Sequence, residues 1–276
     1  MRSLTVPCFV LGALLSALML GSGCSSSSGD VAASDAGVDA APPDGRLLGS
    51  SVAMFGGTIA TWATVSGGVV TEVGVTIPMT TIDGAPAAAW DPRLDAGEMA
   101  PVLALLDFPA FVTATTFVNH LEVDWNALGH PPTQYNKPHF DIHFYRSTRA
   151  EVAAIDCTNF TEPPEDSIPA GYFVPPSNIP GVCVPKMGKH GSPPGDDAPG
   201  LDWDRSMIFG YYGGQFTFIE PMVSRESLQA KASFTLPLPA PPSLHGTTRF
   251  PAKFDGRYDA TKAQYDFVLS DFRTLD

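Results

Sequence analysis

The sequence predicts a mainly β protein, built as an antiparallel β-sandwich or open barrel with one or two short helices. Three observations lead to this prediction. Apolar, β-branched runs alternate with a period of two residues, as half-buried strands do. Glycine-rich dipeptides separate several of these runs and favour tight hairpin turns. The 276 residues include 27 prolines and 26 glycines, a composition that makes turns frequent and long helices rare.

The first half of the chain contains three predicted elements. Residues 51–65 and 69–77 are apolar runs separated by Ser66-Gly67-Gly68, and they predict a β-hairpin. Residues 91–106 predict a short helix or an irregular crossover, because a proline in this segment limits the length of any helix. Residues 113–125 return to the alternation of a strand.

The second half begins with a predicted strand at residues 138–145 and a short helix that Thr148 and Glu151 start as a capping box. Residues 158–204 predict a long loop, and a loop of this length in a compact domain is usually functional or held by a cross-link. The remaining predicted elements are a hairpin around Gly213-Gly214, a short helix at residues 224–228, and strands at residues 232–238 and 265–272.

The N-terminus predicts a targeting segment. Residues 1–23 combine a positive charge at Arg2 with an apolar run and small residues, the features of a signal peptide. The apolar run is shorter than the roughly 20 residues that a membrane-spanning helix needs. Residues 24–45 are rich in Ser, Ala, Asp and Pro and predict a flexible tether. Residues 46–276 are then expected to form a single β-rich domain.

Cys24, preceded by small residues and followed by Ser25, resembles the lipidated cysteine of bacterial lipoprotein signals. The resemblance implies export and a lipid anchor on Cys24 that attaches the protein to a membrane. Ser25 implies an outer-membrane lipoprotein of the bacterial cell envelope, facing the periplasm or the cell surface. The alternative is cleavage by an ordinary signal peptidase without lipidation.

Cysteine usage agrees with export. Once Cys8 leaves with the signal and Cys24 takes a lipid, Cys157 and Cys183 remain, and they predict one disulfide in an oxidising compartment. The formal net charge is −13, which disfavours binding to nucleic acid or to anionic lipid headgroups.

The stretch at residues 138–145 carries the clearest chemical signal in the chain. Strand alternation places His139, Asp141 and His143 on one face. The opposite face receives the apolar residues Phe140, Ile142 and Phe144. The strand is therefore expected to present one face to the core and the other to a functional site.

Imidazole and carboxylate groups are ligands of divalent metals, and zinc is the expected ion. At a rise of roughly 3.3 Å per residue, alternate members of the trio are about 6.6 Å apart and can share one ion. His139 and His143 are about 13 Å apart and need a bulge to do so. Distant candidates are His190, Glu220 and His130. The predicted metal ligands are His139, Asp141, His143, His190 and Glu220, and Asp141 or Glu220 is the predicted general base of a catalytic site.

Two alternatives use these residues without a metal. One is a ligand-binding or catalytic cleft, and the other is a structural cluster in which Asp141 orients the histidines by hydrogen bonds. His120 is expected to be exposed, and His245 is expected in a proline-rich connection outside any site. The motifs of serine hydrolases, helical zinc proteases, phosphate loops and dinucleotide-binding turns do not occur in the sequence.

Four segments together resemble a family of exported bacterial proteins of unknown function. They are Gly129-His130-Pro131-Pro132, residues 138–145, Met187-Gly188-Lys189-His190 and Glu220-Pro221-Met222. The resemblance covers residues 56–228, and residues 138–145 are its most specific part. It implies a β-rich fold, homo-oligomerisation and one site around which the four segments gather. Lys189 departs from the family's pattern, which has a less polar residue there.

The sequence thus favours an exported lipoprotein with a His/Asp-lined divalent-metal site on a β-sandwich, a site suited to a metal-dependent hydrolase or lyase. The competing hypothesis is a non-enzymatic envelope-binding or assembly protein in which the His/Asp cluster is structural or an interface. Whether the protein is an enzyme is left open by the sequence.

Overall fold

The structure is a computed structural model that describes residues 42–87, 102–198 and 200–276. The described residues belong to one compact unit. The predicted signal peptide (1–23), Cys24 and nearly all of the predicted tether (24–45) lie outside the described residues, as does most of the segment 91–106. Across the described ranges, none of the helices has the length and apolar character needed to cross a membrane.

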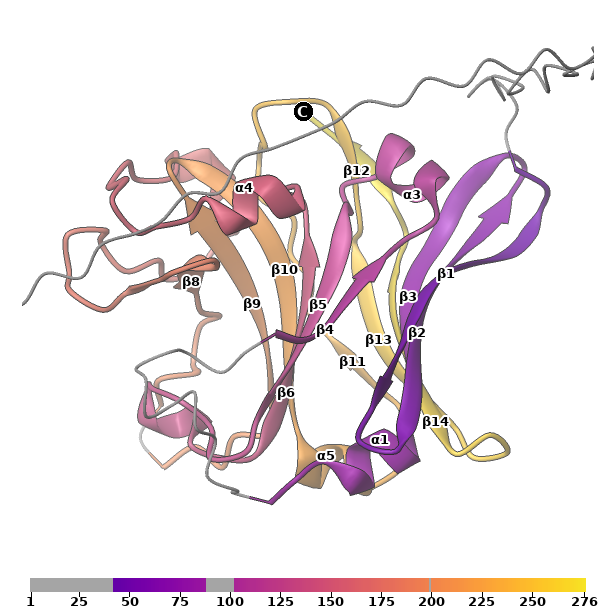
Figure 1. Cartoon of the computed structure of the whole chain (residues 1–276). Helices are drawn as coiled ribbons and strands as arrows, with labels where there is room; N and C mark the ends of the chain where they lie inside the picture. Colours follow the sequence, from indigo (N-terminus) through magenta and orange to yellow (C-terminus); the bar gives the residue numbers. More distant parts are fainter. Residues whose placement is uncertain (1–41, 88–101, 199) are drawn as a thin grey trace, which may run out of the picture. The chain divides into compact units, whose positions relative to one another are not determined.

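Two antiparallel sheets make up this unit, and a short two-stranded sheet accompanies them (Figure 1). The six-stranded sheet has the order β1(Gly45–Met54), β2(Gly57–Ser66), β3(Val69–Pro78), β14(Gln264–Ser270), β13(Lys253–Asp259) and β11(Phe234–Leu236). The seven-stranded sheet has the order β4(Val102–Asp107), β5(His120–Asn126), β6(His139–Tyr145), β10(Gln215–Ser224), β9(Arg205–Tyr212), β8(Gly188–Gly191) and β7(Cys183–Val184). The third pairs β12(Thr248–Phe250) with β15(Arg273–Leu275). The predicted fold class, mainly β and antiparallel, is confirmed.

Four short α-helices occur in the described ranges, where one or two were expected. They are α1(Met79–Gly84), α3(Ala110–Thr115), α4(Arg149–Ala153) and α5(Arg225–Gln229). Helices α1 and α5 lie together at one end of the sheets, and α3 and α4 lie at the opposite end (Figure 1). The predicted capping box starts α4. The Thr148 hydroxyl accepts a hydrogen bond from the Glu151 backbone N–H, and the Glu151 carboxylate accepts one from the Thr148 backbone N–H.

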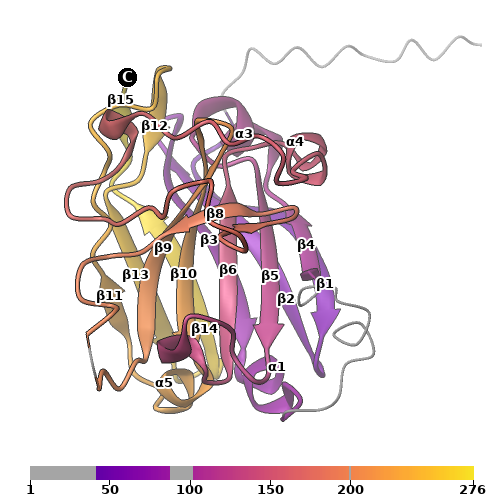
Figure 2. The same ribbon diagram turned by 90° about the vertical axis from the view of Figure 1, so that its left-hand side faces the viewer.

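The main core fills the space between the two large sheets, which lie one in front of the other in Figure 2. Phe140, Ile142 and Phe144 of β6 are fully buried there, together with Val75 and Phe267 from the six-stranded sheet. Burying a side chain of this size contributes about 1.5–3 kcal/mol. The apolar face of the central strand therefore lies in the core, as the alternation predicted.

Four predicted elements differ from the structure. The predicted loop at residues 158–204 contains the strands β7 and β8. The run at residues 51–65 is two strands, β1 and β2, because the chain reverses at Phe55-Gly56 with φ values of 48° and 85°. Both arms of that hairpin are apolar, so the run looked continuous. The last residues of the segment 91–106 belong to strand β4. Residues 113–125 begin in helix α3 and become strand only at β5.

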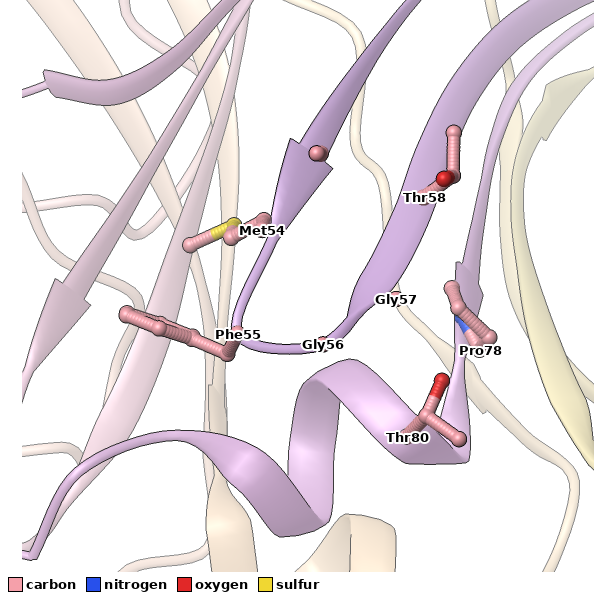
Figure 3. Close-up of a pocket in the computed structure, with 8 residues that line it drawn as sticks. Met54, Phe55, Gly56, Gly57, Thr58, Pro78 and Thr80 are labelled. Carbon is pink, nitrogen blue, oxygen red and sulfur yellow. The ribbon is translucent and has the colours of Figure 1, made fainter.

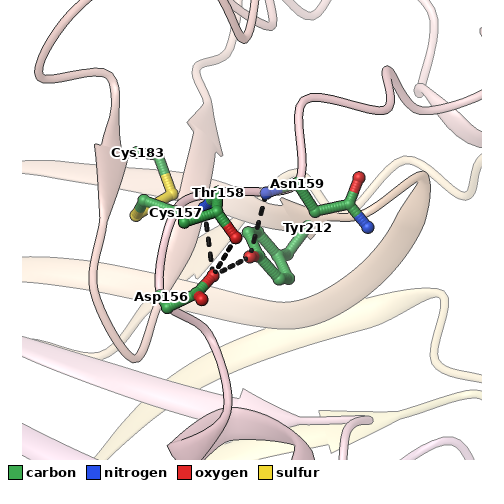
Figure 4. Close-up of a disulfide and its surroundings, with 6 residues drawn as sticks. All are labelled: Asp156, Cys157, Thr158, Asn159, Cys183 and Tyr212. Carbon is green, nitrogen blue, oxygen red and sulfur yellow. Dashed lines mark hydrogen bonds between the residues drawn. A yellow bond between two sulfur atoms is a disulfide. The ribbon is translucent and has the colours of Figure 1, made fainter.

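A disulfide fixes the base of the long loop that precedes β8. Cys157 follows α4, and its sulfur lies at disulfide distance from that of Cys183 on β7, as predicted (Figure 4). Beside it, the Tyr212 hydroxyl donates to Asp156 Oδ1 at 2.7 Å, and the Thr158 backbone N–H donates to the same oxygen at 3.0 Å. Strand β7 in turn pairs with β8, so the cross-link holds the segment that carries His190.

Replacement of both Cys157 and Cys183 by Ser is expected to lower the free energy of unfolding by about 3 kcal/mol, because the closed loop restricts the unfolded chain. Urea denaturation checks this value. Reducing agent added to the parent protein should produce the same loss. A parent and double variant of equal stability would contradict the structural role of the cross-link.

Candidate metal centre

The outer face of the seven-stranded sheet, opposite the core, is polar and yet buried. His139, Asp141 and His143 of β6 lie on this face, as predicted, and expose 4% of their surface or less. Strand β5 places Asp141 opposite Asp124 and His139 opposite Asn126 without any shift in register. Strand β10 places Met222 opposite Asp141 and supplies Glu220. Ionisable side chains from neighbouring strands are thus gathered where water has little access.

Two groups of side chains on this face have ligand-like atoms within 4.8 Å of one another. The His143 group consists of His143, His190 and Glu220, and the His139 group consists of His130, His139 and Asp141. The five predicted metal ligands are therefore divided between two groups, and His130 completes the second. Strand β6 pairs with β5 without a bulge, which keeps His139 and His143 far apart, as the strand geometry requires.

The His143 group combines residues from three strands. Nε2 of His143 lies 3.4 Å from Oε1 of Glu220, and Nε2 of His190 lies 3.8 Å from Oε2 of the same carboxylate. On the other side of the His143 ring, Nδ1 lies 3.4 Å from Oδ2 of Asp124. A carboxylate behind a histidine is the usual second partner of a metal-bound imidazole, where it fixes the ring and its tautomer.

Burial shifts the pKa values of the His143 group. It lowers the pKa of His143 to about 3 and that of His190 to about 4, although the charge of Asp141 opposes both shifts. Burial also raises the pKa of Glu220, and the charges of Asp141 and Asp124 raise it further. The imidazoles are consequently neutral at pH 7, the form in which histidine binds metals.

The His139 group is built around Asp141. Nε2 of His139 lies 3.1 Å from Oδ1 of Asp141, and Nε2 of His130 lies 3.4 Å from Oδ2. Nδ2 of Asn126 donates to Oδ2 at 2.6 Å. Burial alone raises the pKa of Asp141, but His139 and His130 lower it below its usual range.

Several donor and acceptor atoms of the two groups are buried without hydrogen bonds in the described part of the chain. They are Nδ1 and Nε2 of His143, Nε2 of His139, Oδ1 of Asp141 and Oε2 of Glu220. Two atoms bound to one zinc ion at about 2.0–2.1 Å in a tetrahedral site are about 3.3 Å apart. The distances of 3.1–3.8 Å within the two groups match that spacing. A cation in each group would satisfy all of these atoms except Nδ1 of His143, which faces Asp124.

His190 reaches Glu220 because one residue of the intervening strand has no side chain. His190 on β8 is paired with Gly210 on β9, which is paired with Phe218 on β10. The Phe218 ring lies over Gly210 and contacts the rings of both His143 and His190, with centroids 4.8 and 5.3 Å away. Gly210 therefore lets an aromatic ring support the two histidines.

Lys189, next to His190, is buried and paired with an acidic side chain. Its side chain is 3% exposed, and its ammonium group is paired with Glu162 in the disulfide-closed loop. The second oxygen of Glu162 accepts from the Ser177 backbone N–H at 2.6 Å. The residue holds β8 against the loop, and Nε2 of the neighbouring His190 lies near Glu220.

In each group only one side chain is appreciably exposed to solvent. Those of His130 and His190 are 27% and 29% exposed, whereas the other four members expose 6% or less. Trp203 covers His139, with ring centroids 5.2 Å apart, and Tyr135 packs on Trp203. Each group therefore has one histidine that connects it with solvent.

Sequence reasoning missed several residues of this face. Asp124 and Glu122 were assigned only to a strand, Asn126 was placed beyond the end of that strand, and His120 was expected to be exposed. His120 is in fact 1% exposed and stacks on Tyr145. The polar residues of segment 120–126 alternate with Leu121 and Val123, and this pattern indicated a second polar strand face. The acidic residues on that face suggested that it is exposed to solvent.

An open depression elsewhere in the unit offers no comparable chemistry. It lies between the β1–β2 turn and the start of α1 and is lined by Met54, Phe55, Gly57, Pro78 and Thr80, among others (Figure 3). None of its lining residues is titratable.

Gly210→Ala is expected to lower the free energy of unfolding by about 1–3 kcal/mol, because the new Cβ atom would overlap the buried Phe218 ring. Gly246→Ala is the matched control, since the nearest atom to its Cβ is Nη2 of Arg146 at 3.8 Å. Urea denaturation of both variants checks the difference. Equal stabilities would show that the ring is not held against the strand.

The comparisons with known proteins extend over one segment. The family described as "TTHB210-like: Hypothetical protein TTHB210" matches residues 65–125. This segment includes His120, Glu122 and Asp124 but ends before the central strand β6. No curated protein and no solved structure matches the chain. Over residues 65–125 the chain is thus similar to an uncharacterised family, whereas the four segments on which the sequence resemblance is based lie outside this match.

Proposed function

We propose that the protein binds a divalent transition-metal ion, with zinc the expected ion, through His143, His190 and Glu220. One observation carries the proposal. These three side chains come from three strands, and their ligand atoms converge at the spacing of metal ligands. Within the described ranges, Nε2 of His143 and Oε2 of Glu220 are buried without a hydrogen bond. Leaving buried polar atoms unsatisfied costs about 1–3 kcal/mol each, and a bound cation removes that cost.

The set of ligands supports a transition metal over calcium or magnesium. Two imidazoles and one carboxylate suit zinc and its neighbours, whereas calcium and magnesium prefer oxygen ligands alone. Three protein ligands leave a coordination position open, the arrangement of catalytic zinc sites. The exposed side of His190 gives that position a route to solvent.

The chemistry that such a centre supports is hydrolysis or a lyase reaction, because a bound metal ion lowers the pKa of water toward about 7. In this proposal Glu220 is a ligand, since both its oxygens face imidazole nitrogens. A carboxylate that binds the metal is less suited to act as the general base, the other role predicted for Glu220. Asp141 faces His130 and His139 and accepts from Asn126, so it belongs to the neighbouring group.

Export and lipid anchoring at Cys24 form the second part of the proposal. The apolar N-terminal run and the small residues before Cys24 support it, and so does the cross-link between Cys157 and Cys183, which needs an oxidising compartment. The protein would then act in the bacterial envelope, attached to a membrane by its N-terminus.

Metal analysis of the purified protein after incubation with zinc and dialysis tests the centre. His190→Ala is expected to bind about one equivalent of zinc less than the parent, because it removes a ligand. The matched control is His245→Ala, since His245 is exposed, pairs with Asp166 and belongs to neither group. Both histidines are partly exposed, so neither substitution opens a closed core cavity. Equal zinc contents in His190→Ala and the parent contradict the proposal.

Cys24→Ala tests the anchor in the full chain expressed in a bacterium. The parent is expected to incorporate labelled fatty acid and to sediment with membranes, and the variant to do neither, because a lipid chain needs the thiol. Labelling of the variant, or no labelling of the parent, would overturn this part of the proposal.

A further inference from the structure

The His139 group takes no part in the centre proposed above. We infer that it holds a second divalent transition-metal ion, bound by Nε2 of His130, Nε2 of His139 and the carboxylate of Asp141. This inference does not depend on the first centre, because the two groups share no side chain.

Backbone contacts orient both histidines of this group in the same way. Nδ1 of His139 lies 2.6 Å from the carbonyl oxygen of Lys137, and Nδ1 of His130 lies 2.8 Å from that of Pro131. A carbonyl oxygen can only accept, so each Nδ1 carries a hydrogen and donates it. Each Nε2 then has its lone pair available in the neutral ring, and Nε2 of His139 and of His130 lie 3.1 and 3.4 Å from the carboxylate oxygens of Asp141.

Two lone pairs cannot face a carboxylate without a positive charge between them. A proton on one Nε2 atom is the competing solution: burial lowers the pKa of His130, but Asp141 raises it on balance. At His139 a proton does not fit the geometry. Nε2 of His139 and Oδ1 of Asp141 are only 3.1 Å apart, yet in the described part of the protein neither atom makes a hydrogen bond. The N–H direction therefore misses the oxygen. A metal ion lies off the line between its ligands and binds both atoms at this separation.

The surroundings of Asp141 are those of a metal-bound carboxylate. Asn126 donates to its Oδ2 at 2.6 Å, which fixes the carboxylate plane and leaves Oδ1 for a cation. Trp203 covers His139 and donates through Nε1 to Ser206 Oγ at 2.6 Å, so the ring is held in place. Water is excluded on that side, and the partly exposed His130 leaves a route for an ion on the other.

The two groups are electrostatic neighbours along β6. The charge of Asp141 acts on His143, His190 and Glu220 of the other group. An ion at Asp141 would offset this negative charge and would itself influence the first centre. The outer face of the sheet thus offers two separate sets of ligands that share one central strand.

Zinc analysis of matched variants tests the second centre. The variants are His130→Ala, His190→Ala, their combination, and His245→Ala as the control. After incubation with zinc and dialysis, the parent and the control are expected to hold about two zinc ions per chain and each single variant about one. The combined variant is expected to hold none. Far-UV circular dichroism of every variant confirms that the fold is kept, which the partial exposure of His130 and His190 favours.

The possible outcomes separate the two centres. One zinc in the parent that is lost in His190→Ala and kept in His130→Ala overturns the second centre and leaves the first intact. One zinc that is lost in His130→Ala and kept in His190→Ala supports the second centre and removes the first. Unchanged zinc contents in His130→Ala would also overturn the inference.

Discussion

The cost of burying imidazole and carboxylate groups is the constraint on which the arrangement of the outer sheet face depends. An ordinary β-sandwich exposes one face of each sheet to water, but here His139, Asp141, His143 and Glu220 are almost fully covered. An uncompensated buried charge is far more costly than an exposed one. The neutralising partner must therefore come from within the face, as a proton or as a metal ion. The misaligned hydrogen bonds and the ligand-like distances favour the metal ion.

The β fold supplies the rigidity that such a site needs. Successive residues of β6 alternate between the core and the outer face, so packing of Phe140, Ile142 and Phe144 fixes the positions of the polar side chains between them. The neighbouring strands add Asp124 and Glu220 from segments far apart in the sequence. The Phe218 ring, which lies over Gly210, contacts the ring of His190. The disulfide-closed loop holds strand β8, which carries His190, from the other side.

Local patterns predicted the elements that depend on local physics. The alternation in β6, the capping box at Thr148 and Glu151, and the hairpin at Gly213-Gly214 each follow from a few neighbouring residues. The division of the ligands into two groups did not follow, because it depends on the order of strands in the sheet. The burial of His120 could not be read from its acidic neighbours either, since Tyr145 of the adjacent strand stacks on its ring. The break at Phe55-Gly56 was hidden because both arms of the hairpin are apolar.

The central claim is that buried histidines and carboxylates of β6 and its neighbours surround a metal ion. Anomalous diffraction from crystals of the zinc-loaded protein, recorded above and below the zinc absorption edge, tests it most directly. The account predicts an anomalous peak about 2.0–2.2 Å from Nε2 of His143, Nε2 of His190 and the Glu220 carboxylate. Absence of that peak, with Glu220 instead hydrogen-bonded to His143 as a neutral carboxylic acid, would contradict the account.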